Sequence, residues 1–172
     1  LEFDLIKKCV QYVRDNVEGR KVGFTITTNG TLLKGETLDF MVENDISVAI
    51  SLDGSKEEHD ANRRFVNGEG SFDTVIANID TLKQKYPDFF DKVSILTTIN
   101  PHMDLSCVLE YFTVDDVFAD KQIMFNSMNP ISHTESMNYD EKYYLVRNFE
   151  YVKLLFHLIG RLDRDKISKL MY

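Results

Sequence analysis

Polar side chains that can bind a ligand or take part in catalysis follow two apolar runs in the first half of the chain. Thr28 and Asn29 end the first run, Ser51 ends the second, and Arg63 comes soon afterwards in a polar segment. Hydroxyls and amides donate and accept hydrogen bonds, and a guanidinium can hold a carboxylate through two parallel bonds. If both runs are parallel strands, their carboxyl ends meet at one edge of a sheet, where ligands bind. The residues therefore suggest one shared binding site.

Simpler explanations exist for the same residues. Asn29-Gly30 is also a typical turn sequence. Arg63 could form a surface salt bridge with one of the nearby carboxylates, which are Glu57, Glu58 and Asp60. Asp53 and His59, together with Asp60, could instead form an acid/base group of the kind that barrel enzymes carry at this face. The residue types leave these alternatives open, and no catalytic residue is assigned.

The elements that must position these side chains alternate between strand and helix. Apolar residues recur at helical spacing over residues 5–17, 34–44, 72–86 and 104–112. Shorter apolar runs cover residues 22–28, 46–52, 93–99 and 122–126. Ser71 is expected to cap the helix that follows it. This alternation predicts an α/β fold whose parallel strands are joined by helical crossovers.

The pattern changes after Pro130. Apolar residues then step by four and three positions, which predicts a long helix with a packing face made by Leu145, Phe149, Val152, Phe156 and Ile159. A short helix with a solvated, charged face is expected near Asp163. We therefore expect one α/β region over residues 1–130 and a helical extension over residues 131–172.

Composition excludes several classes of function. Among 172 residues, 28 acids outnumber 20 Lys and Arg, so a basic face for nucleic acid is not expected. No apolar run has the length of a membrane span, and a cytoplasmic location is expected. Cys9 and Cys107 fall at apolar positions of helical patterns and are predicted to be buried thiols. The four histidines, His59, His102, His133 and His157, are dispersed, so no metal site is predicted.

Three segments, taken in order, resemble one enzyme family. They are Thr27-Thr28-Asn29-Gly30-Thr31-Leu32-Leu33, the Ser51-Leu52-Asp53-Gly54 strand end, and the His59-Asp60 pair with Arg63. The order is similar to that in radical S-adenosylmethionine (SAM) enzymes, in the peptide- and sulfatase-maturating branch that usually carries a SPASM domain. The resemblance covers about residues 1–130. It implies a partial (β/α) barrel of parallel strands that lacks the first two β/α units, followed by C-terminal helices.

The resemblance also implies roles for individual residues. Ser51 and Arg63 match positions that hold the methionyl carboxylate and the ribose side of SAM. Ile123 matches an apolar position that packs against the adenine. Thr28 and Asn29 match a strand end that lines the cavity between cofactor and substrate. The substrate implied for the full-length parent is a peptide or a protein, which a 5'-deoxyadenosyl radical would oxidise or cross-link.

The family's cluster-binding segment does not occur in this sequence. Radical SAM enzymes hold a [4Fe-4S] cluster with the thiolates of a CxxxCxxC loop, and Cys9 and Cys107 do not form one. We therefore expect an internal part of a longer maturase that is inactive by itself. Its Val22 strand would form an exposed edge that favours dimerisation. Two alternatives remain, a conventional acid/base barrel enzyme and a non-catalytic module that recognises a peptide through the helix at Leu145–Ile159.

Overall fold

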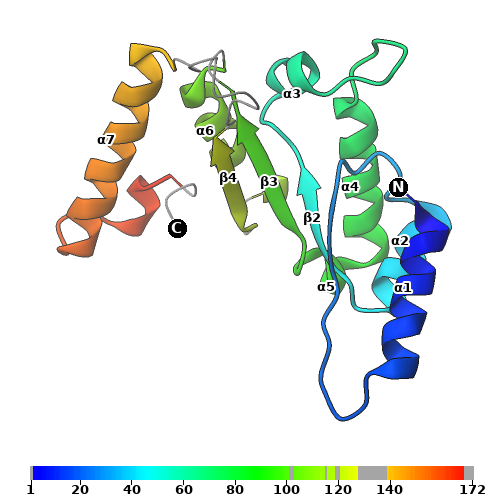
Figure 1. Cartoon of the computed structure of the whole chain (residues 1–172). Helices are drawn as coiled ribbons and strands as arrows, with labels where there is room; N and C mark the ends of the chain where they lie inside the picture. The colour runs from blue at the N-terminus through cyan, green and yellow to red at the C-terminus, as the bar shows by residue number, and fades with distance from the viewer. Residues whose placement is uncertain (1, 101–102, 115, 119–120, 128–138, 169–172) are drawn as a thin grey trace, which may run out of the picture. The chain divides into compact units, whose positions relative to one another are not determined.

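The computed structural model describes residues 2–100, 103–114, 116–118, 121–127 and 139–168. Helices and strands alternate along the chain (Figure 1). The chain divides into two compact units. The first comprises Leu1–Ser51 and Asp73–Val93, and the second comprises Leu52–Phe72 and Ser94–Tyr172.

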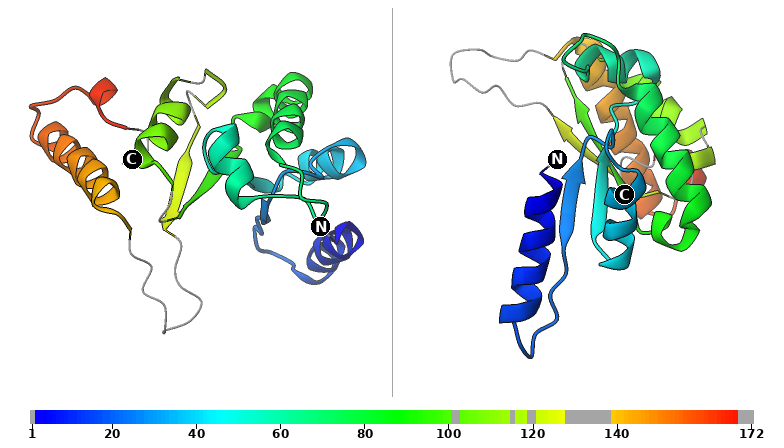
Figure 2. Two further views of the ribbon diagram at one scale, coloured as in Figure 1. Left: turned by 90° about the horizontal axis from the view of Figure 1, so that it is seen from above. Right: turned by 90° about the vertical axis from the view of Figure 1, so that its right-hand side faces the viewer.

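The first unit packs helices against two parallel strands. Its elements are α1 (Phe3–Asn16), β1 (Thr25–Thr28), α2 (Gly35–Glu43), β2 (Ser47–Ser51), most of α4 (Phe72–Lys85) and α5 (Pro87–Phe90). β1 and β2 pair from Thr25↔Ser47 to Thr28↔Ile50. α1 meets α2 through an edge-to-face contact of Phe3 with Phe40. α2 and α4 lie side by side (Figure 2), joined by an ion pair of 2.7 Å between Asp39 and Lys85.

The second unit holds the other two strands. Its elements are α3 (Lys56–Asn62), β3 (Ser94–Ile99), α6 (Leu105–Val114), the 3-10 helix η1 (Asp116–Phe118), β4 (Ile123–Ser127), α7 (Glu141–Leu158) and the 3-10 helix η2 (Arg164–Lys166). β3 and β4 pair in parallel from Ile95↔Ile123 to Ile99↔Ser127. Phe112 and Phe118 are fully buried and contact each other edge to face.

The strands form one four-stranded sheet in the order β1-β2-β3-β4. Strands that follow one another along the chain are therefore neighbours in the sheet, and helices connect them, as parallel pairing requires. Every strand is short, between four residues in β1 and six in β3. The predicted α/β fold with parallel strands is confirmed.

Several predictions about single elements are confirmed. The apolar face of α6 is buried as its spacing predicted, through Leu105, Val108, Leu109 and Phe112. Arg164, Asp165 and Lys166 of η2 are exposed, as the charge run indicated. β1 is shorter than predicted, since it begins at Thr25 and not at Val22.

The prediction of buried thiols is wrong, because both Cys9 and Cys107 are exposed. In α1 the buried residue is the adjacent Val10, so the inward face lies one position further along the helix. In α6 the neighbouring Val108 is buried, and Cys107 lies on the outer side. Apolar periodicity located both helices but did not fix the exact edge of the buried face.

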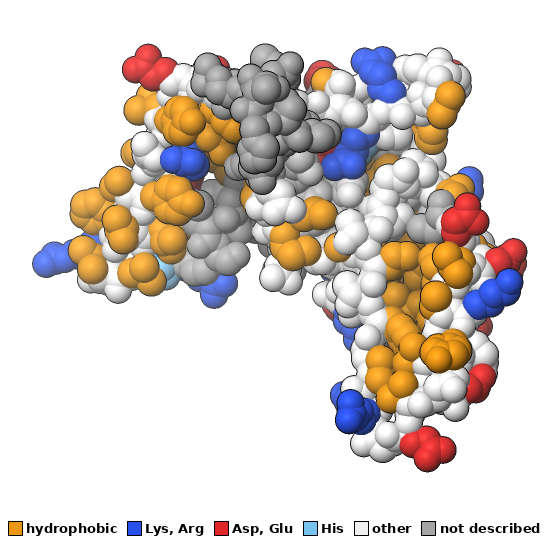
Figure 3. All heavy atoms as spheres, in the orientation of Figure 1, with side chains coloured by type: hydrophobic (Ala, Val, Ile, Leu, Met, Phe, Trp, Pro, Cys, Tyr) orange, Lys and Arg blue, Asp and Glu red, His pale blue; other side chains and the backbone are white. Residues whose placement is uncertain are grey.

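The apolar residues of α7 are mostly on the surface and do not form the packing face that their spacing predicted. Leu145 is 69 % exposed, Phe149 is 62 % exposed and Ile159 is 69 % exposed. Figure 3 shows hydrophobic side chains on the visible surface of this helix, at the left of the view. Asp140 caps the start of the helix, because its carboxylate accepts a hydrogen bond from the Tyr143 amide. The expected boundary between residues 130 and 131 lies outside the described residues.

None of the helices that the structure describes combines the length and hydropathy that a membrane crossing requires.

Candidate functional site

The turn after β1 uses the side chains of Thr28 and Asn29 for its own hydrogen bonds. The Thr28 hydroxyl accepts from the Gly30 amide, and Asn29 Oδ1 accepts from both the amide and the hydroxyl of Thr31. Gly30 has φ +75°, and a Cβ there would lie 3.0 Å from an Ile50 methyl group. These contacts are those of a tight turn. They support the turn interpretation, and a role facing substrate stays a prediction.

The turn is also held by the buried side-chain amide of Asn78, which the sequence analysis did not identify. Asn78 of α4 is 7 % exposed and donates hydrogen bonds to the carbonyls of Gly30 and Thr31. The sequence held one sign of this role, because Asn78 is a polar residue at an inward position of an otherwise apolar helix face. Asn78 therefore fixes the position of the strand end that the sequence marked as functional.

Arg63 lies in the second unit, at the end of α3, and a buried carboxylate holds its side chain. Its Nε and Nη2 donate to the two oxygens of Asp53 at 2.6 and 3.1 Å. Nη2 also donates to the Thr98 hydroxyl at 3.4 Å, and Asp53 Oδ1 accepts from the Thr98 amide at 2.9 Å. The Asp53 side chain is 2 % exposed, whereas the Arg63 side chain is 27 % exposed. Arg63 therefore pairs with the buried Asp53 through two hydrogen bonds, and not with one of the nearby surface carboxylates.

His59 is a buried structural residue in this arrangement. It is fully buried, and its Nδ1 accepts a hydrogen bond from the Asp53 amide. The other nitrogen, Nε2, therefore carries the proton and donates to the Ser71 hydroxyl at 2.9 Å. Ser71 donates in turn to the Arg63 carbonyl. Burial lowers the pKa of His59, which keeps the ring neutral.

Asp60 also contributes to this hydrogen-bond network. Its carboxylate accepts a hydrogen bond from the amide of Phe72, the first residue of α4. Ser71 occupies the predicted cap position, but its hydroxyl bonds to Arg63 and His59. The start of α4 is thus held by Asp60, and the chain segments before and after α3 are tied together.

Ser51 and Ile123 are buried at opposite ends of their strands. Ser51 is the last residue of β2 and is 6 % exposed. Ile123 is the first residue of β4 and aligns with Ile95, whereas Thr98 aligns with Asn126. At about 3.3 Å per residue, Ile123 lies roughly 10 Å along the sheet from the level of Thr98. The proposed contact of Ile123 with adenine, and a ligand shared by Ser51 and Arg63, stay predictions.

The acid/base alternative loses support from this geometry. Asp53 is 1 % exposed and His59 is fully buried. Both carboxylate oxygens of Asp53 and both ring nitrogens of His59 already have hydrogen-bond partners. A general acid or base must reach the proton that it transfers, and these groups are enclosed.

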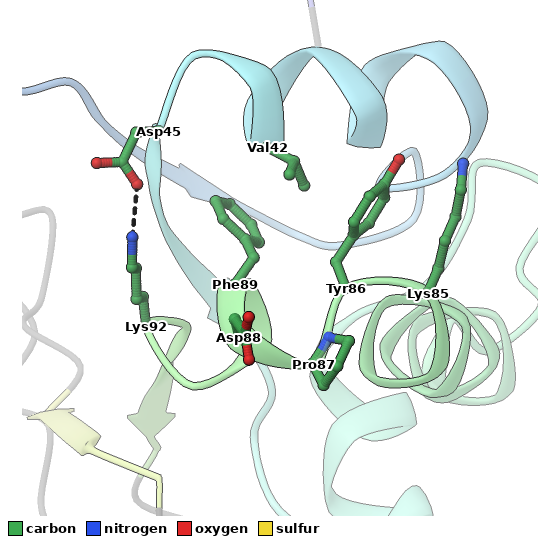
Figure 4. A pocket seen from close by; sticks show the side chains of 8 residues that line it. All are labelled: Val42, Asp45, Lys85, Tyr86, Pro87, Asp88, Phe89 and Lys92. Carbon is green, nitrogen blue, oxygen red and sulfur yellow. Dashed lines mark hydrogen bonds and ion pairs between the residues drawn. The ribbon is translucent and has the colours of Figure 1, made fainter.

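A cavity of about 350 Å³ in the first unit lies at the other end of the strands (Figure 4). Val42, Tyr86 and Phe89 line it, together with Asp45, which comes just before β2. Its lysines are already paired, Lys92 with Asp45 at 2.8 Å and Lys85 with Asp39 at 2.7 Å. Ligands of parallel sheets bind at the carboxyl ends of strands, so this cavity is a poor candidate for the cofactor site.

The described side chains do not offer a cluster site. Across them, no group of three or more His, Cys, Asp or Glu residues is arranged to hold a metal. His102 and His133 lie outside the described residues. The sequence contains two cysteines, fewer than the family's CxxxCxxC loop. The chain alone therefore does not fit a [4Fe-4S] cluster.

The comparison with protein families is decisive. The family model of the radical SAM superfamily matches residues 1–112. The chain belongs to the radical SAM superfamily.

Individual relatives of this radical SAM chain agree with that membership. A cysteine-type anaerobic sulfatase-maturating enzyme of Clostridium novyi is 35% identical over 99 residues, which are 57% of this chain and 25% of the enzyme. A serine-type enzyme of Bacteroides thetaiotaomicron is 38% identical over 78 residues, 45% of this chain and 19% of the enzyme. The resemblance to the sulfatase-maturating branch is confirmed.

A solved structure shares the fold of the chain. Native anSMEcpe with bound AdoMet and Cp18Cys peptide superposes with a TM-score of 0.70 at 23% identity, over 92% of this chain and 45% of that one. The matched region is less than half the length of either sulfatase-maturating relative and of the chain in this solved structure.

Proposed function

We propose that the chain is the cofactor-binding part of a radical SAM maturase that modifies a peptide or protein substrate. Arg63 carries this proposal, because its guanidinium is held in place and partly exposed beside the carboxyl end of β3. A fixed guanidinium can bind a carboxylate through directed hydrogen bonds, and SAM carries a carboxylate. The sulfatase-maturating relatives support the class of substrate.

The other predicted contacts complete the proposed site. Ser51 would bind the methionyl and ribose side, Ile123 would pack against adenine, and Thr28 with Asn29 would face the substrate. In the full-length protein, one electron from its [4Fe-4S] cluster would cleave bound SAM into methionine and a 5'-deoxyadenosyl radical, and this radical would remove hydrogen from the substrate. The [4Fe-4S] cluster and any SPASM domain belong, in this proposal, to parts of the full-length protein outside these 172 residues. By itself the chain would be inactive.

Replacing Arg63 by Ala tests the proposal. In the cluster-reconstituted full-length protein, we expect SAM affinity to fall by roughly tenfold or more, because a charge-assisted hydrogen bond is lost. Equilibrium dialysis with labelled SAM measures this. Arg64→Ala is the matched control, because Arg64 is the adjacent arginine and bonds to the Gly68 carbonyl in an exposed loop. Equal affinity in the Arg63→Ala variant and the wild-type protein would remove the assigned role of Arg63.

The exposed apolar surface of α7 favours a second candidate, the peptide-binding module. Leu145 and Phe149 border a groove between α6 and α7 that Leu109 also lines. If the module is correct, Phe149→Glu should abolish peptide binding measured by fluorescence anisotropy and leave SAM affinity unchanged. If SAM binding is the function, Arg63→Ala should weaken SAM binding and Phe149→Glu should not.

A further inference from the structure

The ion pair with Asp53 occupies one edge of the Arg63 guanidinium and leaves the other edge open to a ligand. Nε and Nη2 point to the two Asp53 oxygens. Among the described residues, Nη1 has no hydrogen-bond partner. The Arg63 side chain is 27 % exposed, whereas that of Asp53 is 2 % exposed. A ligand can therefore reach the outer edge of Arg63 but not the carboxylate behind it.

Asp53 is itself held rigidly. Its Oδ1 accepts from the Thr98 amide of β3 at 2.9 Å, and its own amide donates to the buried His59 ring. The next residue, Gly54, has φ +105°, and a Cβ there would lie 3.2 Å from a Val108 methyl group. The backbone and the side chain of Asp53 are thus both held in place, so the carboxylate has a fixed orientation toward Arg63.

We propose that Asp53 is a positioning residue that orients Arg63 toward the carboxylate of SAM. This inference rests on the proposed function. Asp53 does not touch the ligand and acts only through the guanidinium. An arginine side chain loses considerable rotamer freedom when it is fixed, and the pair with Asp53 removes that freedom before the ligand arrives. Preorganisation of this kind raises affinity by lowering the entropic cost of binding.

A double-mutant cycle distinguishes positioning from a separate effect. Asp53→Asn, Arg63→Ala and the double variant are compared for SAM dissociation constant in the cluster-reconstituted full-length protein. The asparagine has about the same size, but its amide nitrogen cannot accept a hydrogen bond from Nε. We expect Asp53→Asn to weaken SAM binding roughly tenfold with Arg63 present, and to have no further effect when Arg63 is already Ala.

Three outcomes overturn a claim, and they do so separately. If Arg63→Ala does not weaken binding, the assigned role of Arg63 in the proposed function fails. If Arg63→Ala weakens binding but Asp53→Asn weakens it by the same factor in both backgrounds, Asp53 acts independently and the positioning inference fails. The inference also fails if Asp53→Asn binds SAM as tightly as the wild-type protein.

Two further variants guard against unfolding and general charge effects. Asp39→Asn is the matched control, because it removes a surface carboxylate that pairs with Lys85, and it should leave SAM affinity unchanged. If Asp53→Asn does not fold, Arg63→Lys tests the same claim. Lysine keeps the positive charge but cannot bond both carboxylate oxygens as a planar fork. The inference predicts a loss close to that of Arg63→Ala, and wild-type affinity for Arg63→Lys would overturn it.

Discussion

Within the segment from Asp53 to Phe72, buried polar side chains have specific partners. Asp53 pairs with Arg63, and His59 connects the Asp53 amide to Ser71. The Asp60 carboxylate accepts from the Phe72 amide. Buried polar groups that lack partners cost about 1–3 kcal/mol each, so replacing one member of this network leaves another unsatisfied.

Acid should destabilise the protein through His59. The unfolded ring has a pKa of about 6.5, and burial lowers the pKa of the folded ring. Above pH 6.5 both states are neutral, so His59 adds no pH dependence there. Below it the unfolded state binds the proton first, and the free energy of unfolding decreases until the pH passes the folded pKa.

Urea unfolding at pH 7.5, 6.5 and 5.5 measures this effect. His59→Gln cannot titrate, so its stability should change less between pH 6.5 and 5.5 than that of the wild-type protein. His157→Gln serves as the control, since that ring is part-buried and bonds to the Leu162 carbonyl. Identical slopes for the wild-type protein and the His59→Gln variant would show that His59 does not cause the acid sensitivity.

The start of α4 depends on a close approach between a glycine and a carboxylate. A Cβ at Gly70 would clash with a carboxylate oxygen of Asp60. Gly70 has no positive φ in this structure, so the restriction is one of space. An added methyl group must displace Asp60, which would then lose its bond to the Phe72 amide.

Gly70→Ala should therefore lower the free energy of unfolding by about 1–2 kcal/mol, the usual effect of losing a helix cap. Gly23→Ala is the matched control, because a Cβ there meets nothing within 4 Å and its φ is not positive. Urea unfolding compares the two variants. If Gly70→Ala and Gly23→Ala are equally stable, Asp60 can move without cost and the explanation is wrong.

How much the sequence could predict differed between elements. α6 was predictable because its inward residues have strict helical spacing and all are buried. α3 was missed, because Lys56–Asn62 is polar except for Ala61 and buries only His59. No periodic apolar signal exists for such a helix, whose packing depends on hydrogen bonds made by distant residues.

The sequence suggested the residue types of the candidate site but not its geometry. Ser51 and Arg63 were proposed from their positions after apolar runs, and the family resemblance implied their roles, which stay predictions. The partner of Arg63 could not be chosen from the sequence, because Glu57, Glu58 and Asp60 are all closer along the chain than Asp53. The choice depends on how the chain turns after β2 and on the Thr98 amide of β3.

At the scale of the whole molecule, the sheet ends in β1, which pairs with β2 on one side. An unpaired strand edge can pair with another copy of the chain, so we predict concentration-dependent dimerisation of the 172-residue chain. Multi-angle light scattering across a range of concentrations measures it. Thr25→Pro removes one backbone donor from β1 and should reduce the dimer.

The exposed apolar surface of α7 is a second possible cause of dimerisation, and a control variant distinguishes it from the β1 edge. Phe156→Glu places a charge on the exposed apolar surface of α7, where Phe156 is 50 % exposed. If that substitution and not Thr25→Pro yields monomers, association occurs through the helix. A monomer at all concentrations would count against the strand-edge prediction.

The pairing of Arg63 with Asp53 also has a kinetic consequence. Two opposite charges 2.6 Å apart form a compact dipole whose field falls off faster with distance than that of an isolated cation. The pair therefore attracts little from afar, and an approaching carboxylate is recognised only over the last few ångströms. If this arginine is the main anchor, the association rate should depend weakly on ionic strength, and selectivity should reside in how long the ligand stays bound.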